Sequence, residues 1–211
     1  MTSKEEFEEV YQKPGAIWTM ESPPKILKDL VETGFIKPGK SLDIACGEGF
    51  YSIYLAEHGF NVTGIDFSER ALKYARENVI KSKQNIRLIN LDVGNISSLS
   101  ERFDFLFEWG LLHHLNDVEI TAYLSKLPQI MNANGLYLSA SFNPNSNVYG
   151  KSGQRYRETP LGTKLYYRSP EELKKLLAPN FDILREEVIQ LEGRGISQPG
   201  NFFLLRKRLR S

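Results

Sequence analysis

Ser41-Leu-Asp-Ile-Ala-Cys-Gly-Glu-Gly-Phe50 is the stretch that decides the fold. The short apolar run Leu42–Ala45 breaks into two glycines, Gly47 and Gly49, and a helical apolar spacing begins at Phe50. The pattern predicts a strand, a tight turn and a helix whose N-terminus points back at the turn. Glycines let a ligand approach the backbone where a Cβ would collide. The free N–H groups of the helix start then face that ligand.

A second strand signal follows and ends in an acidic residue. Gly59-Phe-Asn-Val-Thr-Gly-Ile-Asp66 is apolar enough for a buried strand that neighbours the first. A carboxylate at the tip of this strand is placed to accept hydrogen bonds from a ribose diol. The two segments together predict a nucleoside-bearing cofactor.

The rest of the chain alternates between strand and helix patterns. We expect helices over 23–34, 69–82 (with Ser68 as N-cap) and 118–131, and strands over 86–92, 103–108 and 136–140. Such alternation predicts an α/β, doubly wound parallel sheet with helices on both faces. Right-handed crossovers place every carboxyl end on one edge, where ligands of such sheets bind. Asp43–Gly49, Asp66, Asp92 and Glu108–His114 are all expected at that edge.

Residues 143–168 interrupt the alternation after the fifth strand. This polar segment, rich in glycine and tyrosine, is too long for an ordinary connection and is expected to act as a substrate lid. One interpretation is a solvated loop whose tyrosines pack on the core. The other is a closing surface in which Arg155 and Arg157 select a small aromatic or anionic acceptor.

The C-terminal part predicts a helix and two strands. Ser169-Pro-Glu-Glu172 carries the signature of a capping box, and the helix is expected to end near Leu177. Residues 181–192 and 201–208 are expected to form an antiparallel pair at the sheet edge, joined by 193–200. The basic cluster 206–210 is either a solvated strand end or a nucleic-acid contact.

Composition limits the class of protein. The chain has 211 residues, 41% hydrophobic and 25% charged, with a net charge of +1, which favours one globular domain over 1–211 and no nucleic-acid or membrane partner. Cys46 is the single cysteine, so it forms no internal disulfide. It is either a nucleophile or, as we expect, a small residue that fills the turn. With no signal core and no apolar run near ~20 residues, a soluble cytoplasmic protein is expected. No metal site is predicted.

Residues 1–22 form an N-terminal arm with two interpretations. An acidic opening leads into a segment with Tyr11 and Trp18. The arm is either a surface segment packed by these two rings or a flap that closes over the cofactor.

The glycine turn alone also describes a dinucleotide-binding domain, and three details point elsewhere. Asp43 lies inside the strand, where it suits holding the turn or anchoring a cationic amino group. Ser52 occupies the place of the third glycine of that fingerprint. Asp92 ends the third strand, where its carboxylate can accept a hydrogen bond from an adenine amine.

These residues resemble the first three motifs of the class I S-adenosylmethionine-dependent methyltransferases. Asp43 to Gly49 is similar to the first motif, with Ala45 in the place of its first glycine. Asp66 and Phe67 resemble the second-strand acid and its neighbour, and Asp92 with Val93 resembles the adenine-edge motif. The compact chain looks similar to small-molecule methyltransferases of the thiopurine and natural-product kind.

The resemblance implies a Rossmann-like seven-stranded sheet of order 3-2-1-4-5-7-6, with strand 7 antiparallel. It also implies S-adenosyl-L-methionine as cofactor, S-adenosyl-L-homocysteine as product and a small-molecule acceptor. The residues expected to bind the cofactor come from the arm, the glycine turn and the strand ends: Trp18, Asp43, Ala45, Cys46, Gly47, Gly49, Phe50, Asp66, Phe67, Asp92, Val93, Glu108 and Trp109. The oligomeric state stays open, with a homodimer as one option.

Three residues after the fourth strand are candidates for catalysis. His113 and His114 are the obvious bases, although adjacent histidines point in different directions and a ring bonded to backbone is the ordinary alternative. Glu108 is a third candidate, with bonding near the cofactor as its expected task. A base is needed only if the acceptor is a hydroxyl or a protonated amine.

Two rival functions remain open from the sequence. One is a nicotinamide-dependent reductase, and the other is a catalytically silent module that binds S-adenosylmethionine for a partner. The sequence does not identify the methyl acceptor or the atom (S, N, O or C) that is methylated.

Overall fold

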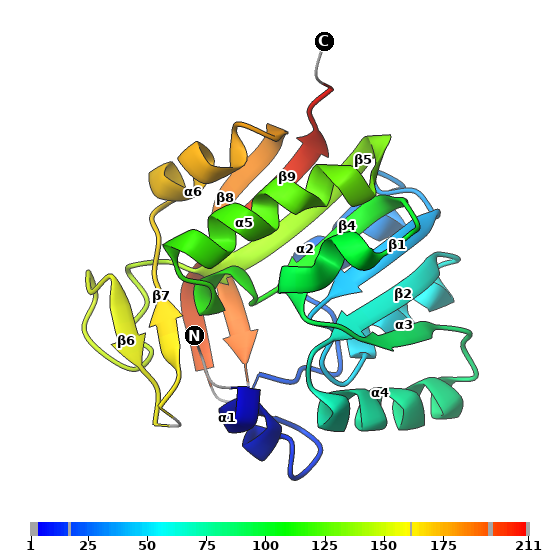
Figure 1. The fold of residues 1–211 in the computed structure, drawn as a ribbon, viewed down its shortest axis with the longest axis horizontal. Coiled ribbons are helices and arrows are strands. Elements are labelled where there is room, and N and C mark those ends of the chain that lie inside the picture. Colours follow the sequence, from blue (N-terminus) through cyan, green and yellow to red (C-terminus); the bar gives the residue numbers. More distant parts are fainter. Residues whose placement is uncertain (1–3, 17, 161, 194–195, 210–211) are drawn as a thin grey trace.

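The predicted strand–turn–helix lies at the centre of the sheet. In the computed structural model, which describes residues 4–16, 18–160, 162–193 and 196–209, strand β1 (Lys40–Ile44) runs into helix α3 (Phe50–Glu57). β1 pairs in parallel with β2 (Asn61–Asp66) and with β4 (Phe103–Trp109). The glycine turn and the end of β2 are therefore neighbours at one edge of the sheet (Figure 1).

The seven strands have the order β3-β2-β1-β4-β5-β9-β8, which confirms the predicted topology. The remaining strands of this sheet are β3 (Arg87–Asn90), β5 (Met131–Phe142), β8 (Phe181–Gly193) and β9 (Ile196–Lys207). β9 runs antiparallel to both of its neighbours and corresponds to the predicted strand 7. The labels differ because a hairpin in the lid takes the names β6 and β7.

Helices cover both faces of the sheet. α2 (Lys25–Glu32), α3 and α4 (Glu69–Ser82) pack with one apolar cluster, and α5 (Asp117–Lys126) and α6 (Pro170–Leu177) pack with the other. Along β1, Leu42 and Ile44 enter the cluster under α5, so Asp43 between them faces α3. This alternation puts a carboxylate beside the start of α3.

The helix starts follow the predicted caps. Ser68 accepts a hydrogen bond from Ala71 N at 3.0 Å, and Ser169 and Glu172 form the reciprocal capping box at the start of α6. Both predictions are confirmed. In each case a side-chain oxygen accepts a hydrogen bond from an N–H group that has no partner within the helix.

The helix predicted over 118–131 is shorter than expected. α5 ends at Lys126, the 3₁₀ turn η3 (Leu127–Ile130) contains Pro128, and β5 already begins at Met131. Proline lacks the N–H that would continue the α-helix, which explains the change.

The two C-terminal strands and the lid also contain more structure than the sequence predicted. The expected connection 193–200 is mostly strand: β9 begins at Ile196, and Pro199 O accepts from Asn143 N at 3.1 Å. The lid contains a short hairpin of β6 (Tyr156–Glu158) and β7 (Lys164–Tyr166). The proline and glycine residues of these segments led to a prediction of loops, whereas tertiary contacts hold the chain in an extended conformation there.

The described part of the arm lies against the carboxyl edge. Helix α1 (Lys4–Val10) contacts α4, and Tyr11 and Ala16 are buried against Ala71. None of the helices described is both long enough and apolar enough to cross a bilayer.

Candidate active site

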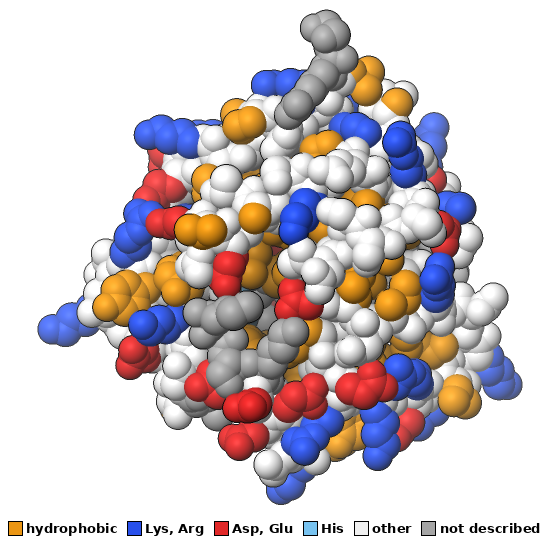
Figure 2. Space-filling view, viewed as in Figure 1, with side chains coloured by type: hydrophobic (Ala, Val, Ile, Leu, Met, Phe, Trp, Pro, Cys, Tyr) orange, Lys and Arg blue, Asp and Glu red, His pale blue; other side chains and the backbone are white. Residues whose placement is uncertain are grey.

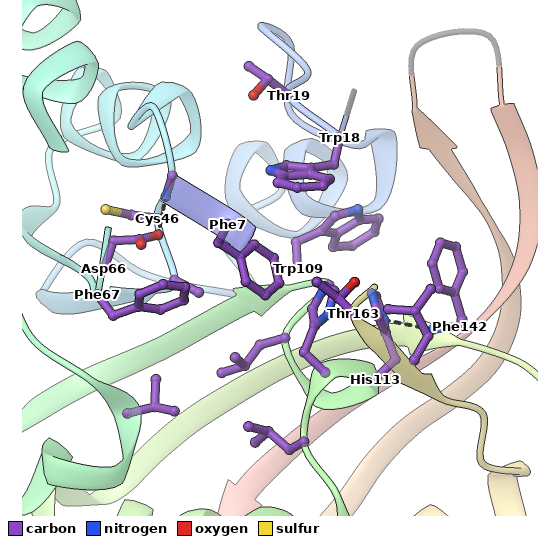
Figure 3. Close-up of a pocket in the computed structure, with 18 of the residues that line it drawn as sticks. Phe7, Trp18, Thr19, Cys46, Asp66, Phe67, Trp109, His113, Phe142 and Thr163 are labelled. Carbon is purple, nitrogen blue, oxygen red and sulfur yellow. Dashed lines mark hydrogen bonds between the residues drawn. The ribbon is translucent and has the colours of Figure 1, made fainter. Parts of the chain in front are cut away.

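A cavity of about 710 Å³ opens at the carboxyl ends of β1, β2 and β4. In Figure 3 the rings of Phe7, Trp18 and Trp109 lie between the end of β2 and the segment of His113. The predicted site residues that line the cavity are Trp18, Asp43, Ala45, Cys46, Gly47, Gly49, Phe50, Asp66, Phe67, Asp92, Val93, Trp109, His113 and His114. Glu108 is the one predicted residue that does not line it.

The glycine turn has the backbone that the sequence requires. Ala45, Gly47 and Gly49 all have positive φ, at 60°, 53° and 80°. A Cβ on Gly49 would lie 3.2 Å from the Cβ of Ala75 in α4, so this position is restricted by packing as well as by conformation. Ala45 takes the left-handed conformation at a cost of roughly 1 kcal/mol.

Asp66 holds the turn and borders the cavity. Its carboxylate accepts from Gly47 N and from Ser68 N, each at 2.9 Å. Burial raises the pKa of Asp66 to about 6. Since each carboxylate oxygen has a second lone pair, the same group can also accept from a ligand hydroxyl.

Asp43 is the second buried carboxylate of the cavity. It accepts from Ser52 Oγ at 2.6 Å, and burial, with the nearby charge of Asp66, raises the pKa of Asp43 to about 7. The charged neighbours that act on the two groups, Asp66 on Asp43 and Glu8 on Asp66, are themselves acids. This donor set fits a ligand that brings both a cation and hydroxyl groups, as the predicted cofactor does.

The end of the cavity that is expected to hold the adenine ring has apolar walls and the carboxylate of Asp92. Asp92 accepts from Gly94 N at 2.6 Å and lines the cavity with Phe67 and Val93. Phe7 from the arm packs edge-on against Phe67, with ring centroids 5.4 Å apart. A planar base fits between such walls.

Glu108 does not line the cavity, which argues against its candidacy as a base and against its expected task of bonding the cofactor directly. It is fully buried and accepts from Leu111 N at 2.8 Å and from the hydroxyl of Ser139. Burial raises its pKa to about 7. The side chain stabilises the turn that leaves β4 and does not face the reacting atoms.

His113 faces the cavity as a hydrogen-bond donor. The backbone N–H of Phe142 donates to His113 Nδ1 at 3.2 Å, as Figure 3 shows, so Nδ1 carries the lone pair. Burial, the neighbouring His114 and Arg168 keep the pKa of His113 well below its usual range. In a neutral ring with Nδ1 as acceptor the proton lies on Nε2, so His113 offers the cavity a donor and no base.

His114 is a poor base for a different reason. Burial lowers the pKa of His114 to about 4, and its Nδ1 is buried without a hydrogen-bond partner. Its ring packs edge-on against Phe7 at 5.0 Å. At neutral pH this ring is uncharged, and its basicity is low.

The acceptor end of the cavity is largely apolar. Phe142 of β5 and Thr163 of the lid lie beside His113 at this end (Figure 3), and Leu165 of the lid also lines the cavity. Among the described residues that line the cavity, Lys126 is the only Lys or Arg, and its Nζ donates to Gly94 O near Asp92. This end therefore offers apolar shape, the His113 ring and the hydroxyl of Thr163 to an acceptor.

The lid arginines do not reach the cavity, which corrects the interpretation that they select an anionic acceptor. The Arg157 guanidinium is buried, donates to the carbonyls of Ser146 and Val148 at 2.7 and 2.9 Å and lies 3.9 Å over the Tyr167 ring. Arg155 pairs with Asp117 and Glu172 at the surface. Both cations hold the lid together.

Several cavity residues were not predicted. Among them are Phe7 and Thr19 of the arm, Phe142, and Thr163 and Leu165 of the lid. Ser52 and Glu48 were not assigned contacts either, although both lie in or next to the glycine turn. A local motif gives no signal for partners that come from distant segments.

The similarity of this chain to a known protein family covers the segment that contains the glycine turn. A family model described as "Methyltransferase domain" matches residues 42–135. The "Putative methyltransferase YqeM" of Bacillus subtilis is 43% identical over 74 residues, which cover 35% of this chain and 30% of that protein. A "Ubiquinone biosynthesis O-methyltransferase" of Pelagibacter ubique is 28% identical over 181 residues, covering 75% of this chain and 73% of that protein.

A solved structure shares the fold over nearly the whole chain. It is the Burkholderia thailandensis 1,6-didemethyltoxoflavin-N1-methyltransferase with bound 1,6-didemethyltoxoflavin and S-adenosylhomocysteine. The TM-score is 0.76 at 20% identity, with 96% of this chain and 86% of that chain covered.

Proposed function

We propose that this chain, which belongs to the class I S-adenosylmethionine-dependent methyltransferases by its domain match and its relatives, transfers a methyl group to a small-molecule acceptor. One observation carries the proposal. The cavity that Asp43 and Asp66 border continues past Trp109 to His113 and Thr163, so one space serves both cofactor and acceptor. A plugged space would have favoured a silent binding module.

In this proposal the cofactor supplies an electrophilic methyl group on sulfur, which an acceptor lone pair displaces in line. Asp43 pairs with the amino group, Asp66 accepts from the ribose hydroxyls and Asp92 meets the adenine edge. Trp109 and Phe50 place ring faces near the methyl group, where electron-rich faces stabilise a cation. The contribution of the chain is positioning, worth several kcal/mol when the lone pair is held about 3–3.5 Å from the carbon.

The chemistry of the acceptor end points to an acceptor that needs no protein base. His113 offers an Nε2 proton, and His114 has a pKa near 4. Such an acceptor must accept a hydrogen bond from His113 and must attack without losing a proton to the protein. A flat molecule with an aromatic nitrogen, or with a phenol or thiol that ionises readily, can do both. His113 then donates to an acceptor atom on the ring, and the apolar walls exclude water.

A small molecule fits this site better than a nucleic acid. Figure 2 shows Asp and Glu side chains gathered along the lower edge of the molecule, where Figure 1 places α1, and Glu6 of α1 lines the cavity. Acidic side chains near the cavity repel a phosphate backbone. A cytoplasmic location completes the proposal as an expectation, and the oligomeric state stays open, with a homodimer as one option.

The test is transfer from cofactor labelled in the methyl group to a panel of small acceptors. The panel contains heteroaromatic nitrogens, phenols and thiols, and mass spectrometry locates the label. We expect labelled product from at least one flat aromatic acceptor and less of it from Asp66→Ala. Bound S-adenosylhomocysteine with no transfer to any class would support the silent module, and reduction by NADH would support the reductase.

A further inference from the structure

Glu48, between the two motif glycines, joins the cofactor turn to the N-terminal arm. Its carboxylate is buried and accepts from Gly15 N at 2.8 and 3.0 Å, from Ala16 N at 3.1 Å and from Thr19 Oγ1 at 2.7 Å. Its own backbone carbonyl accepts from Asn78 Nδ2 at 3.0 Å. One residue therefore fixes the arm to the turn and the turn to α4.

The three donors form a cradle for an anion. Gly15 has a φ of 82°, and the N–H groups of Gly15 and Ala16 converge on the same carboxylate. Successive N–H groups in such a turn bind anions, and hydrogen bonds to a charged acceptor are about twice as strong as neutral ones. Because all three donors are neutral, the Glu48 charge is held by hydrogen bonds and not by a cation.

The segment that Glu48 holds carries the rings that cover the adenosine end. Trp18 Nε1 donates to the Tyr11 hydroxyl at 2.9 Å, and Phe7 packs against Trp18 and Phe67 at 5.8 and 5.4 Å. A second contact secures the other end of the arm, since Glu69 N donates to the Glu8 carboxylate at 2.9 Å. Figure 3 shows Trp18 and Phe7 over the side of the cavity where Asp66 lies.

We propose that Glu48 is a positioning residue that latches the described part of the arm (residues 4–16 and 18–20) over the adenosine end of the cavity. The latch works through the arm: with Gly15, Ala16 and Thr19 fixed, Phe7 and Trp18 stay in place and cofactor leaves only when the arm lifts. Closure of this kind excludes water and slows release. The proposal rests on the cofactor assignment made above and adds the residue that controls cofactor residence.

The test measures the dissociation rate of S-adenosylhomocysteine by stopped-flow tryptophan fluorescence. Glu48→Ala is expected to release it roughly 10–100-fold faster, because Gly15 N, Ala16 N and Thr19 Oγ1 all lose their charged acceptor. Glu9→Ala, which removes an exposed charge from the same arm, is the matched control and is expected to release at the wild-type rate. Equal rates for Glu48→Ala and wild type would overturn the latch.

A second measurement separates the latch from the cofactor assignment. Hydrogen exchange of the Gly15 and Ala16 amides in the chain without ligand is expected to be slow in wild type and fast in Glu48→Ala. If wild type does not bind S-adenosylhomocysteine, the cofactor assignment fails, and exchange still decides the latch. Slow exchange of both amides in Glu48→Ala would refute it.

A third pair of variants covers the case in which Glu48→Ala does not fold. Thr19→Val removes the hydroxyl donor and keeps the shape, whereas Thr19→Ser keeps the donor. We expect faster release of S-adenosylhomocysteine from the valine variant only, by a factor of roughly 3–10, the worth of one hydrogen bond. Equal release from the two variants would contradict the latch, because loss of the donor would then have no effect.

Discussion

The two ends of the cavity use charge in opposite ways. At the proposed cofactor end, Asp43 and Asp66 are buried at the cavity wall and accept hydrogen bonds from the chain, and the charged neighbours that raise their pKa values are acids. At the acceptor end, Arg157 and Arg168 donate to backbone carbonyls, and Glu108 binds the turn after β4. In the first case the charged groups border the cavity, and in the second they bind backbone groups outside it.

This difference assigns different tasks to the two ends. Buried carboxylates that lack a cation favour a ligand that supplies one, since both groups then lose less on leaving water. Cations already bonded to carbonyls cannot select an anionic acceptor. Specificity at the acceptor end must therefore come from apolar shape and from the His113 donor.

The largest loss of cofactor affinity is expected from Asp66→Ala, because the Asp66 carboxylate both holds the glycine turn and is predicted to bind the ribose. Asp66→Ala removes the acceptor for Gly47 N and Ser68 N as well as the predicted ribose contact. We expect S-adenosylhomocysteine to bind roughly 10²–10³-fold more weakly by calorimetry, from hydrogen bonds to a charged group worth about 1.5–3 kcal/mol each. Unchanged affinity would mean that the ribose lies elsewhere.

Asp43→Asn should separate binding from stability. The folded pKa of about 7 lies above the usual value near 3.9, so the ionised group costs stability. That cost is absent below about pH 4, grows as pH rises and is complete above about pH 7. Asparagine can still accept from Ser52, so we expect a higher melting temperature at pH 8, a gain of order 1–4 kcal/mol, and little gain at pH 4.

The same variant should bind S-adenosylhomocysteine roughly 10–100-fold more weakly at pH 8, because the cationic amino group loses its partner. In wild type, affinity should rise from pH 6 to pH 8 as Asp43 ionises. A variant that is destabilised at pH 8 and binds normally would remove Asp43 from the cofactor end.

The lid arginines test the acceptor end. Arg157→Ala leaves the carbonyls of Ser146 and Val148 without a donor and should loosen the lid. We expect the acceptor KM to rise about 10-fold, with cofactor affinity within about 2-fold, since the change lies outside the cofactor end. Arg155→Ala, at an exposed ion pair worth about 0–1 kcal/mol, should leave both nearly unchanged. A raised acceptor KM for Arg155→Ala alone would restore the anionic interpretation.

The smallest effect is expected inside the motif. Ala45→Gly relieves the left-handed strain at φ 60° but adds freedom to the unfolded chain. We expect the free energy of unfolding to rise by at most about 1 kcal/mol, with unchanged cofactor affinity. A loss of stability in denaturant titrations would show that the alanine methyl makes a contact that outweighs the strain.

The cofactor end could be read from the sequence because its elements are consecutive. Asp43, the glycine turn and Asp66 lie within two neighbouring strands, so spacing and crossover rules alone bring them to one edge. The strand order required the family resemblance, since several orders satisfy the same pattern.

The acceptor end could not be read in this way. The bonds of Arg157 to Ser146 and of Phe142 N to His113 join segments whose proximity no local pattern predicts. The role of His113 changed from base to donor because its tautomer depends on a single backbone N–H from β5. The residue type showed that His113 could act as a base or as a hydrogen-bond donor, and its tertiary contact with Phe142 N leaves only the role of donor.

The most direct test of the cofactor end is calorimetric titration of the full chain at pH 8 with S-adenosylhomocysteine and, in parallel, with NADH. We predict one S-adenosylhomocysteine bound per chain and no binding of NADH. Binding of NADH in place of S-adenosylhomocysteine would contradict the assignment of Asp43 and Asp66 to an adenosine that carries a cation.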